Sequence, residues 1–274
     1  MADSVDDLIA ELVAILVDLL PGGDVDALPR EEFVAELRDA LRQVPDIVQP
    51  YRDEAYREGV REAGGDPPDD EIYEDLEELE RWWSEQTEKL VTLVEHGEVE
   101  HQVVRARAES LLKREATTQL SAAQDQGLAD QAEALGWDSI FVPERDACLW
   151  CTSYAGAVAH GGREEFEPVR NFTADARLGP ITIPVHPWCR CKRQVVHPDD
   201  ARSVARPLKR EAERAVLRFE SLPSESDRAR TEAAARLLAA GTALPKTVIE
   251  RSERAVRRRR KDEGPARKRR TTSP

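Results

Sequence analysis

All four cysteines of the chain lie in two short segments, Cys148-Leu149-Trp150-Cys151 and His186-Pro187-Trp188-Cys189-Arg190-Cys191. The first segment is a Cys-x-x-Cys pair and the second contains a His-x-x-Cys pair, and such pairs are the two half-sites of a tetrahedral zinc centre. Two residues between ligands let a tight turn aim both side chains at one ion, at about 2.0–2.3 Å from the metal. The spacing therefore predicts that the two segments converge on a single structural zinc ion.

The preferred ligands are Cys148, Cys151, His186 and Cys189. Cys191 competes for the fourth position, because a Cys-x-Cys arrangement can supply a second thiolate and leave the imidazole outside the shell. The intervening segment is rich in Gly, Pro and charge, so it can bury little apolar surface by itself. An ion that ties two distant turns together would stabilise such a region.

Two other interpretations of the cysteines remain open. The first is a disulfide or a set of free thiols, but nothing at the N-terminus directs the chain to an oxidising compartment, and clustered intracellular cysteines favour metal. The second is a nucleophilic Cys148 with His186 as its base, which would also need an orienting Asp or Asn that the sequence does not place. A closed four-ligand site offers no position for water or substrate, so we expect no enzymatic activity.

A wider pattern surrounds the cysteines. A helix ends in Ala134-Leu135-Gly136-Trp137, a short apolar strand contains Phe141-Val142, and Asp146-Ala147-Cys148-x-x-Cys151, Gly156 and His186-Pro187-x-Cys189-Arg190-Cys191 follow. This pattern resembles the phage Mu protein F-like head morphogenesis family, the minor capsid proteins of tailed phages. The resemblance covers residues 100–197, and the upstream segment Arg114-Glu115-Ala116-Thr117 resembles part of the family's preceding helix.

The resemblance implies a virion component, made in the host cytoplasm and located inside the head. It implies association with the portal protein and with capsid or scaffold proteins, in head assembly and in DNA packaging or delivery. The cysteines and His186 carry over as the family's metal or knuckle residues. Ala147 stands where the family usually has a polar residue, so no hydroxyl role is expected there.

Composition and charge favour an extended helical body. Of the 274 residues, 34% are charged, 40% are hydrophobic and only 5% are aromatic, which is little for one well-packed globule. The net charge of −14 is uneven: residues 1–100 carry 30 acidic and 8 basic side chains, whereas residues 251–274 carry 3 acidic and 11 basic ones. The middle of the chain is therefore close to neutral.

The N-terminal half reads as a series of helices. Apolar residues recur with helical spacing over residues 4–20, 29–45, 46–63, 71–96 and from 98 to 125 or beyond. We assign residues 1–65 to an acidic helical bundle and residues 66–137 to a long helical hairpin or arm. The acidic opening lacks the positive charge of a signal peptide, and Glu11 and Asp18 interrupt the first apolar run, so a soluble protein without a membrane span is expected.

The rest of the chain comprises a knuckle and a helical extension. Residues 138–199 form the Cys/His knuckle region, with short strands predicted at 139–142, 181–185 and 192–196. His160, which precedes Gly161-Gly162, is interpreted as a turn residue. Residues 200–256 are assigned to C-terminal helices and 257–274 to a basic disordered tail. The predicted fold is mainly α with a small α+β part, in which long helices flank a small zinc-knuckle-like β region.

The tail suggests contact with nucleic acid. It contains nine clustered basic residues: Arg257, Arg258, Arg259, Arg260, Lys261, Arg267, Lys268, Arg269 and Arg270. A run of like charges without aromatics suits sequence-independent contact with phosphates, here with packaged double-stranded DNA. The tail is equally compatible with docking on the acidic half of a neighbouring copy in a homo-oligomer, on portal or scaffold surfaces, or with a merely solubilising role.

A second hypothesis from another class is a zinc-knuckle nucleic-acid-binding protein that is not part of a virion. In that case the knuckle and the tail would both contact nucleic acid. A treble-clef-like nuclease fits less well, because no His-Asn or acidic pair suited to a catalytic metal accompanies His186. Neighbouring genes separate the first two hypotheses, since portal, terminase and capsid genes are expected only beside a head protein.

Overall fold

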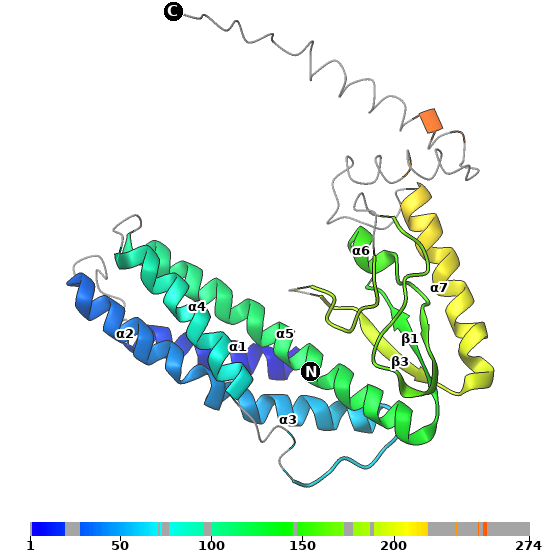
Figure 1. The fold of residues 1–274 in the computed structure, drawn as a ribbon, viewed down its shortest axis with the longest axis horizontal. Coiled ribbons are helices and arrows are strands. Elements are labelled where there is room, and N and C mark those ends of the chain that lie inside the picture. The colour runs from blue at the N-terminus through cyan, green and yellow to red at the C-terminus, as the bar shows by residue number, and fades with distance from the viewer. Residues whose placement is uncertain are drawn as a thin grey trace, which may run out of the picture. The chain divides into compact units, whose positions relative to one another are not determined.

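The computed structural model of the chain describes residues 2–19, 28–70, 72, 77–95, 100–144, 147–172, 178–186 and 189–218, with Ala234, Lys246, Ile249 and Glu250 as single residues. The described chain is mainly helical with a small three-stranded sheet, so the predicted fold class is confirmed (Figure 1). Of the C-terminal helices predicted over residues 200–256, the structure describes residues 200–218 and those four single residues, and the basic tail lies outside the described residues. None of the described helices is both long and apolar enough to cross a bilayer.

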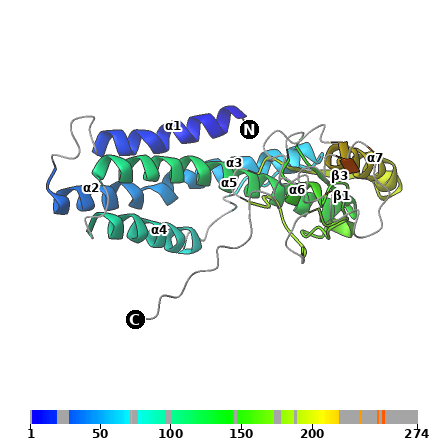
Figure 2. The ribbon, with the colours of Figure 1, turned by 90° about the horizontal axis from the view of Figure 1, so that it is seen from above.

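Contacts divide the chain into two compact units. The first comprises Met1–Ser139, His160–Glu164 and Thr182–Val196. Its helices are α1 (Ala2–Leu19), α2 (Arg30–Arg42), α3 (Val44–Glu62), α4 (Glu77–Glu95) and α5 (His101–Leu135). The most extensive helix pairing in this unit joins α3 to α5, while α1 and α4 lie on opposite sides of that pair (Figure 2).

Apolar stripes explain why these segments are helical. Phe33, Leu37 and Leu41 recur every four residues along α2 and are fully buried, as their spacing predicts. Leu8, Leu12 and Leu16 do the same along α1. Together with residues of α3, α4 and α5 they form one hydrophobic core.

The helix α5 ends where the sequence predicts. It runs for 35 residues, from His101 through Gly127 to Leu135, with Gly136 as its C-cap, in agreement with the helix end predicted at Ala134-Leu135-Gly136-Trp137. Gly136 adopts the left-handed conformation with a φ of 65°, and the N–H of Trp137 donates to the carbonyl oxygen of Ala132 at 2.8 Å. This is the usual arrangement at a glycine-terminated helix end. Gly136 therefore terminates the helix.

The sheet has the strand order β2-β1-β3, with β1 at Asp138–Val142, β2 at Val158–Ala159 and β3 at Lys192–Val196. The strands predicted at 139–142 and 192–196 are confirmed. The strand predicted at 181–185 is wrong, because there only Ile181 pairs, in an isolated bridge with Phe166, and the chain then bends. Pro184 has no N–H to donate to a ladder, which is why β-branched residues alone do not make this segment a strand.

The second unit comprises Ile140–Ala159, Glu165–Ile181 and the chain from His197 onwards. It contains α6 (Leu149–Thr152) and α7 (Pro198–Arg218). Phe141 lies at its centre, with the ring of Tyr154 at 5.9 Å and that of Phe166 at 5.5 Å between centroids. Burial raises the pKa of Tyr154, whose hydroxyl donates to the carbonyl oxygen of Gly179 at 2.7 Å.

Candidate metal centre

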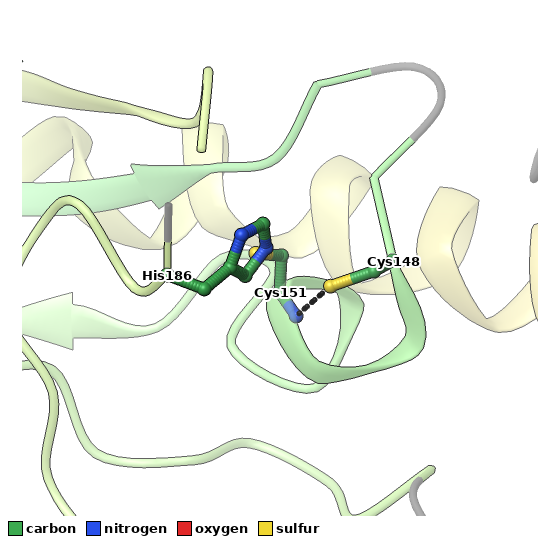
Figure 3. A group of neighbouring side chains, drawn as sticks. All are labelled: Cys148, Cys151 and His186. Carbon is green, nitrogen blue, oxygen red and sulfur yellow. Dashed lines mark hydrogen bonds between the residues drawn. The ribbon is translucent and has the colours of Figure 1, made fainter. Parts of the chain in front are cut away.

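The first half-site is a single helical turn that begins at Cys148. Cys148 is the N-cap of α6, and the backbone N–H of Cys151 donates to its sulfur at 3.5 Å (Figure 3). An N–H directed at the sulfur stabilises the thiolate, which is the form that binds a metal. The two-residue spacing thus brings both cysteines onto one face of one turn, as a Cys-x-x-Cys half-site requires.

Ser153 fixes this turn to the loop that follows it. Its hydroxyl donates to the carbonyl oxygen of Leu149 at 2.9 Å and accepts the N–H of Phe172 at 3.1 Å. Its own carbonyl oxygen accepts the N–H groups of Val169 and Arg170. Ser153 is fully buried, so these bonds form away from water and hold the half-site in a defined position.

The second half-site lies directly before a strand. The backbone N–H of Cys189 donates to the carbonyl oxygen of His186 at 3.0 Å, which brings the two residues of the His-x-x-Cys pair together. Cys191 directly precedes β3. Cys189 and Cys191 are both buried, with 2% and 6% of their surface exposed.

The structure brings all five candidate ligands into two overlapping groups. The sulfurs of Cys148 and Cys151 and a ring nitrogen of His186 lie within 4.8 Å of one another (Figure 3). The sulfurs of Cys151, Cys189 and Cys191 likewise lie within 4.8 Å of one another. Cys151 belongs to both groups. His186 and Cys191, which are predicted to compete for the fourth ligand position, each lie in one of the two groups.

The chemistry of these donors fits a metal ion. Thiolate sulfur and imidazole nitrogen are soft or borderline ligands, typical of zinc and of other thiophilic ions. All four cysteines carry thiols in the structure, and three of them are buried. Burying several thiolates is costly unless a cation compensates them, and a bound ion supplies that charge. The grouped residues can therefore hold a metal ion.

No sequence pattern predicts the buried ion pair between Asp125 and Arg193. The guanidinium donates from Nε to Oδ1 and from Nη2 to Oδ2 of the carboxylate, both at 2.9 Å, and the side chains are 0% and 7% exposed for Arg193 and Asp125. Burial raises the pKa of Asp125, while the hydrogen bonds from Arg193 act in the opposite direction. The only signal in the sequence is an arginine inside the predicted strand 192–196, where it takes a buried position between the exposed Lys192 and Gln194.

His160 lies apart from these groups. It belongs to a short 3₁₀ turn, η2 (His160–Gly162), as its place before two glycines predicts. Its Nδ1 lies 2.9 Å from Oδ2 of Asp138, and the N–H of Gly161 donates to the other carboxylate oxygen at 3.2 Å. Among the described residues, no metal-type group includes His160.

The nine basic residues predicted to contact nucleic acid, from Arg257 to Arg270, lie outside the described part of the chain. Comparisons with protein-family models, with curated proteins and with solved structures find no match for the chain. The resemblance to the Mu F-like family therefore stays a prediction from the motif residues. What the structure adds to that prediction is the grouping of the motif's cysteines and histidine.

Proposed function

We propose that this chain is a minor head protein of a tailed phage, of the Mu F-like kind, in which a structural zinc ion stabilises the Cys/His knuckle. In this proposal the protein lies inside the head, contacts the portal and the capsid or scaffold, and acts in head assembly and in DNA packaging or delivery. The observation that carries it is the grouping of Cys148, Cys151 and His186, and of Cys151 with Cys189 and Cys191. These are the residues of both halves of the family-like motif.

The number and kind of donors favour a structural zinc site over a catalytic one. Three or four thiolates with at most one imidazole make a closed tetrahedral shell, whereas catalytic zinc keeps one position for water. Such a closed shell contributes to folding instead of activating a substrate. A structural zinc ion is consistent with an assembly protein that performs no chemical step.

The first compact unit, which contains α1 to α5 and is called the helical unit below, has a surface charge that favours protein partners over DNA. Among its described residues up to Glu100, 17 acidic but only 5 basic side chains are exposed. Such a surface repels phosphates and attracts basic protein surfaces, within about 8–10 Å at physiological salt. Contact with DNA is therefore assigned to the basic residues of 257–274.

Mass spectrometry of purified, DNase-treated particles tests the proposal. Particles of the phage that carries this gene should contain the chain at a constant number of copies, protected from added protease until the head is opened. Particles from a phage with an in-frame deletion should lack it and should be defective in head assembly or DNA delivery. Absence of the chain from normal particles would refute the proposal.

The basic tail favours one second candidate, a zinc-knuckle nucleic-acid-binding protein outside any virion. Such a protein would bind duplex or single strands in the infected or host cell and would be missing from particles. The particle experiment separates the two, and so do the neighbouring genes. Portal and terminase genes upstream and a capsid gene downstream would support the head protein.

A further inference from the structure

Three of the five candidate ligands lie in the single segment His186–Cys191, and one carboxylate on α5 binds the chain on both sides of that segment. Arg193, two residues after Cys191, donates two hydrogen bonds of 2.9 Å to Asp125. The backbone N–H of Ile183, three residues before His186, also donates to Asp125. Asp125 thus holds both flanks of the ligand segment.

The geometry leaves the guanidinium little freedom. Its Nη1 donates to the carbonyl oxygen of Arg163 at 3.0 Å, and its Nη2 donates to that of Glu164 at 2.6 Å. A planar guanidinium with two bonds to one carboxylate and two to neighbouring carbonyl groups has a single orientation. Because Arg193 is fully buried, water does not replace any of these acceptors.

We propose that Asp125 is a positioning residue of the metal centre, which fixes the segment His186–Cys191 on α5 before a metal ion arrives. A ligand segment held in its bound conformation loses less conformational freedom on metal binding, so the affinity is higher. Residues of this kind, one step removed from the ligands, orient the ligands themselves. The inference rests on the proposed function in one respect, that the chain binds zinc.

The alternative is an ion pair that supports the helical unit without affecting the metal. The two roles differ in what a substitution changes. A purely structural pair alters the stability of the metal-free chain but leaves the zinc affinity of the folded chain unchanged. A positioning residue also alters that affinity and the coordination geometry.

The test compares two buried, ion-paired carboxylates of the same helix. Asp125→Asn removes the charge that holds Arg193 and keeps the size of the side chain. Glu115→Gln is the matched control. Glu115 lies ten residues before Asp125 on α5, is also buried, and pairs with Arg114 at 2.9 Å. Zinc affinity of each full-length chain is measured by competition with a chromogenic chelator, and the geometry by the visible spectrum of the cobalt-substituted protein.

We expect Asp125→Asn to weaken zinc binding by about 10- to 100-fold and to change the cobalt spectrum. Glu115→Gln should leave both unchanged. Arg193→Lys keeps the positive charge but not the paired hydrogen bonds, so its zinc affinity should lie between those of Asp125→Asn and Glu115→Gln. This variant also serves as the test if Asp125→Asn does not fold.

Two results are decisive and distinguishable. If the wild-type chain binds zinc and both Asp125→Asn and Arg193→Lys bind it with wild-type affinity and spectrum, the positioning role is overturned and the proposed function stands. If the wild-type chain binds no zinc, the metal centre itself is overturned, and this inference with it.

Discussion

Gly59 of α3 and Gly127 of α5 mark a close crossing of the two helices. A Cβ atom added to Gly59 would lie 2.2 Å from the carbonyl oxygen of Gln124, and one added to Gly127 would lie 2.2 Å from that of Tyr56. These obstacles are backbone atoms, which cannot move aside as a flexible side chain does. The closest approach of α3 to α5 therefore depends on the absence of side chains at both positions.

Substitution of Gly127 by alanine should destabilise the helical unit. Alanine normally favours a helix by about 1 kcal/mol over glycine, but here the added methyl group forces the backbones apart. We expect a net loss of about 1–3 kcal/mol in the free energy of unfolding, measured by denaturation with guanidinium chloride. Gly179→Ala is the control, because nothing lies within 4 Å of the added Cβ atom there. A stabilised Gly127→Ala variant would contradict the close crossing.

The helices can be predicted from the sequence, but this close crossing cannot. Periodicity predicts each helix from α1 to α5, because the apolar stripes that it detects are the surfaces buried in the core. In the sequence, Gly127 and Gly136 both look like glycines at the C-terminal end of the helix predicted from residue 98. A glycine that permits close packing and one that ends a helix look alike in a sequence, and only the partner helix α3 distinguishes them.

Trp83 of α4 is buried in the core of the helical unit, with 2% of its surface exposed. Its indole Nε1 is also buried and has no hydrogen-bond partner among the described residues. Trp83→Ala should cost about 3–5 kcal/mol of unfolding free energy, because it leaves a large cavity. Trp83→Phe should cost only about 1–2 kcal/mol, because the lost apolar contact is partly offset by removal of an unpaired polar group. Equal losses in the two variants would show that the indole N–H has a partner.

The candidate metal centre was predictable to a different extent. The spacing of Cys148, Cys151, His186 and Cys189 points to the candidate ligands, because ligand spacing is a local property, and the structure places these residues in the two groups of donors. The contact between Asp125 and Arg193 joins residues 68 positions apart and has no local pattern. The segment 181–185 is predicted as a strand from its β-branched residues, although Pro184 lacks the N–H donor that a strand position needs.

The basic tail should account for binding to DNA. A chain that lacks residues 257–274 should lose salt-dependent binding to random duplex DNA, measured by fluorescence anisotropy. If the tail contacts 6–10 phosphates, the affinity of the full chain should fall by about 10³–10⁵-fold between 50 and 200 mM salt. A control chain with the tail residues in scrambled order should bind as tightly as the wild type, because the contact depends on charge and not on sequence. Unchanged binding by the truncated chain at low salt would refute the assignment.

Removal of Cys151 should have the largest effect on metal binding. Cys151 is the one residue shared by both groups of donors, so neither group is complete without it. Cys151→Ser should abolish the binding of about one zinc ion per chain, measured by native mass spectrometry, and should lower the midpoint of thermal unfolding. Treatment of the wild type with a strong chelator should lower it in the same way. A Cys151→Ser chain that keeps its zinc would contradict a shared site.

The identity of the fourth ligand can be predicted from charge. Zinc with three thiolates and one imidazole carries one net negative charge, whereas zinc with four thiolates carries two, and the second charge is costly to bury. We therefore expect His186 to be the ligand and Cys191 to lie outside the shell in the wild type. In the cobalt-substituted protein, the sulfur-to-metal charge-transfer band grows with the number of thiolates. Cys191→Ser should leave this band unchanged.

His186→Ala should then still bind the metal, because Cys191 lies within 4.8 Å of Cys151 and can take the vacated position. Its charge-transfer band should be stronger than that of the wild type, since a fourth thiolate replaces the imidazole. Its affinity should fall more steeply at acidic pH, because one more thiol must lose its proton before the metal binds. A weaker band in Cys191→Ser, with no change in His186→Ala, would reverse the assignment and make Cys191 the fourth ligand.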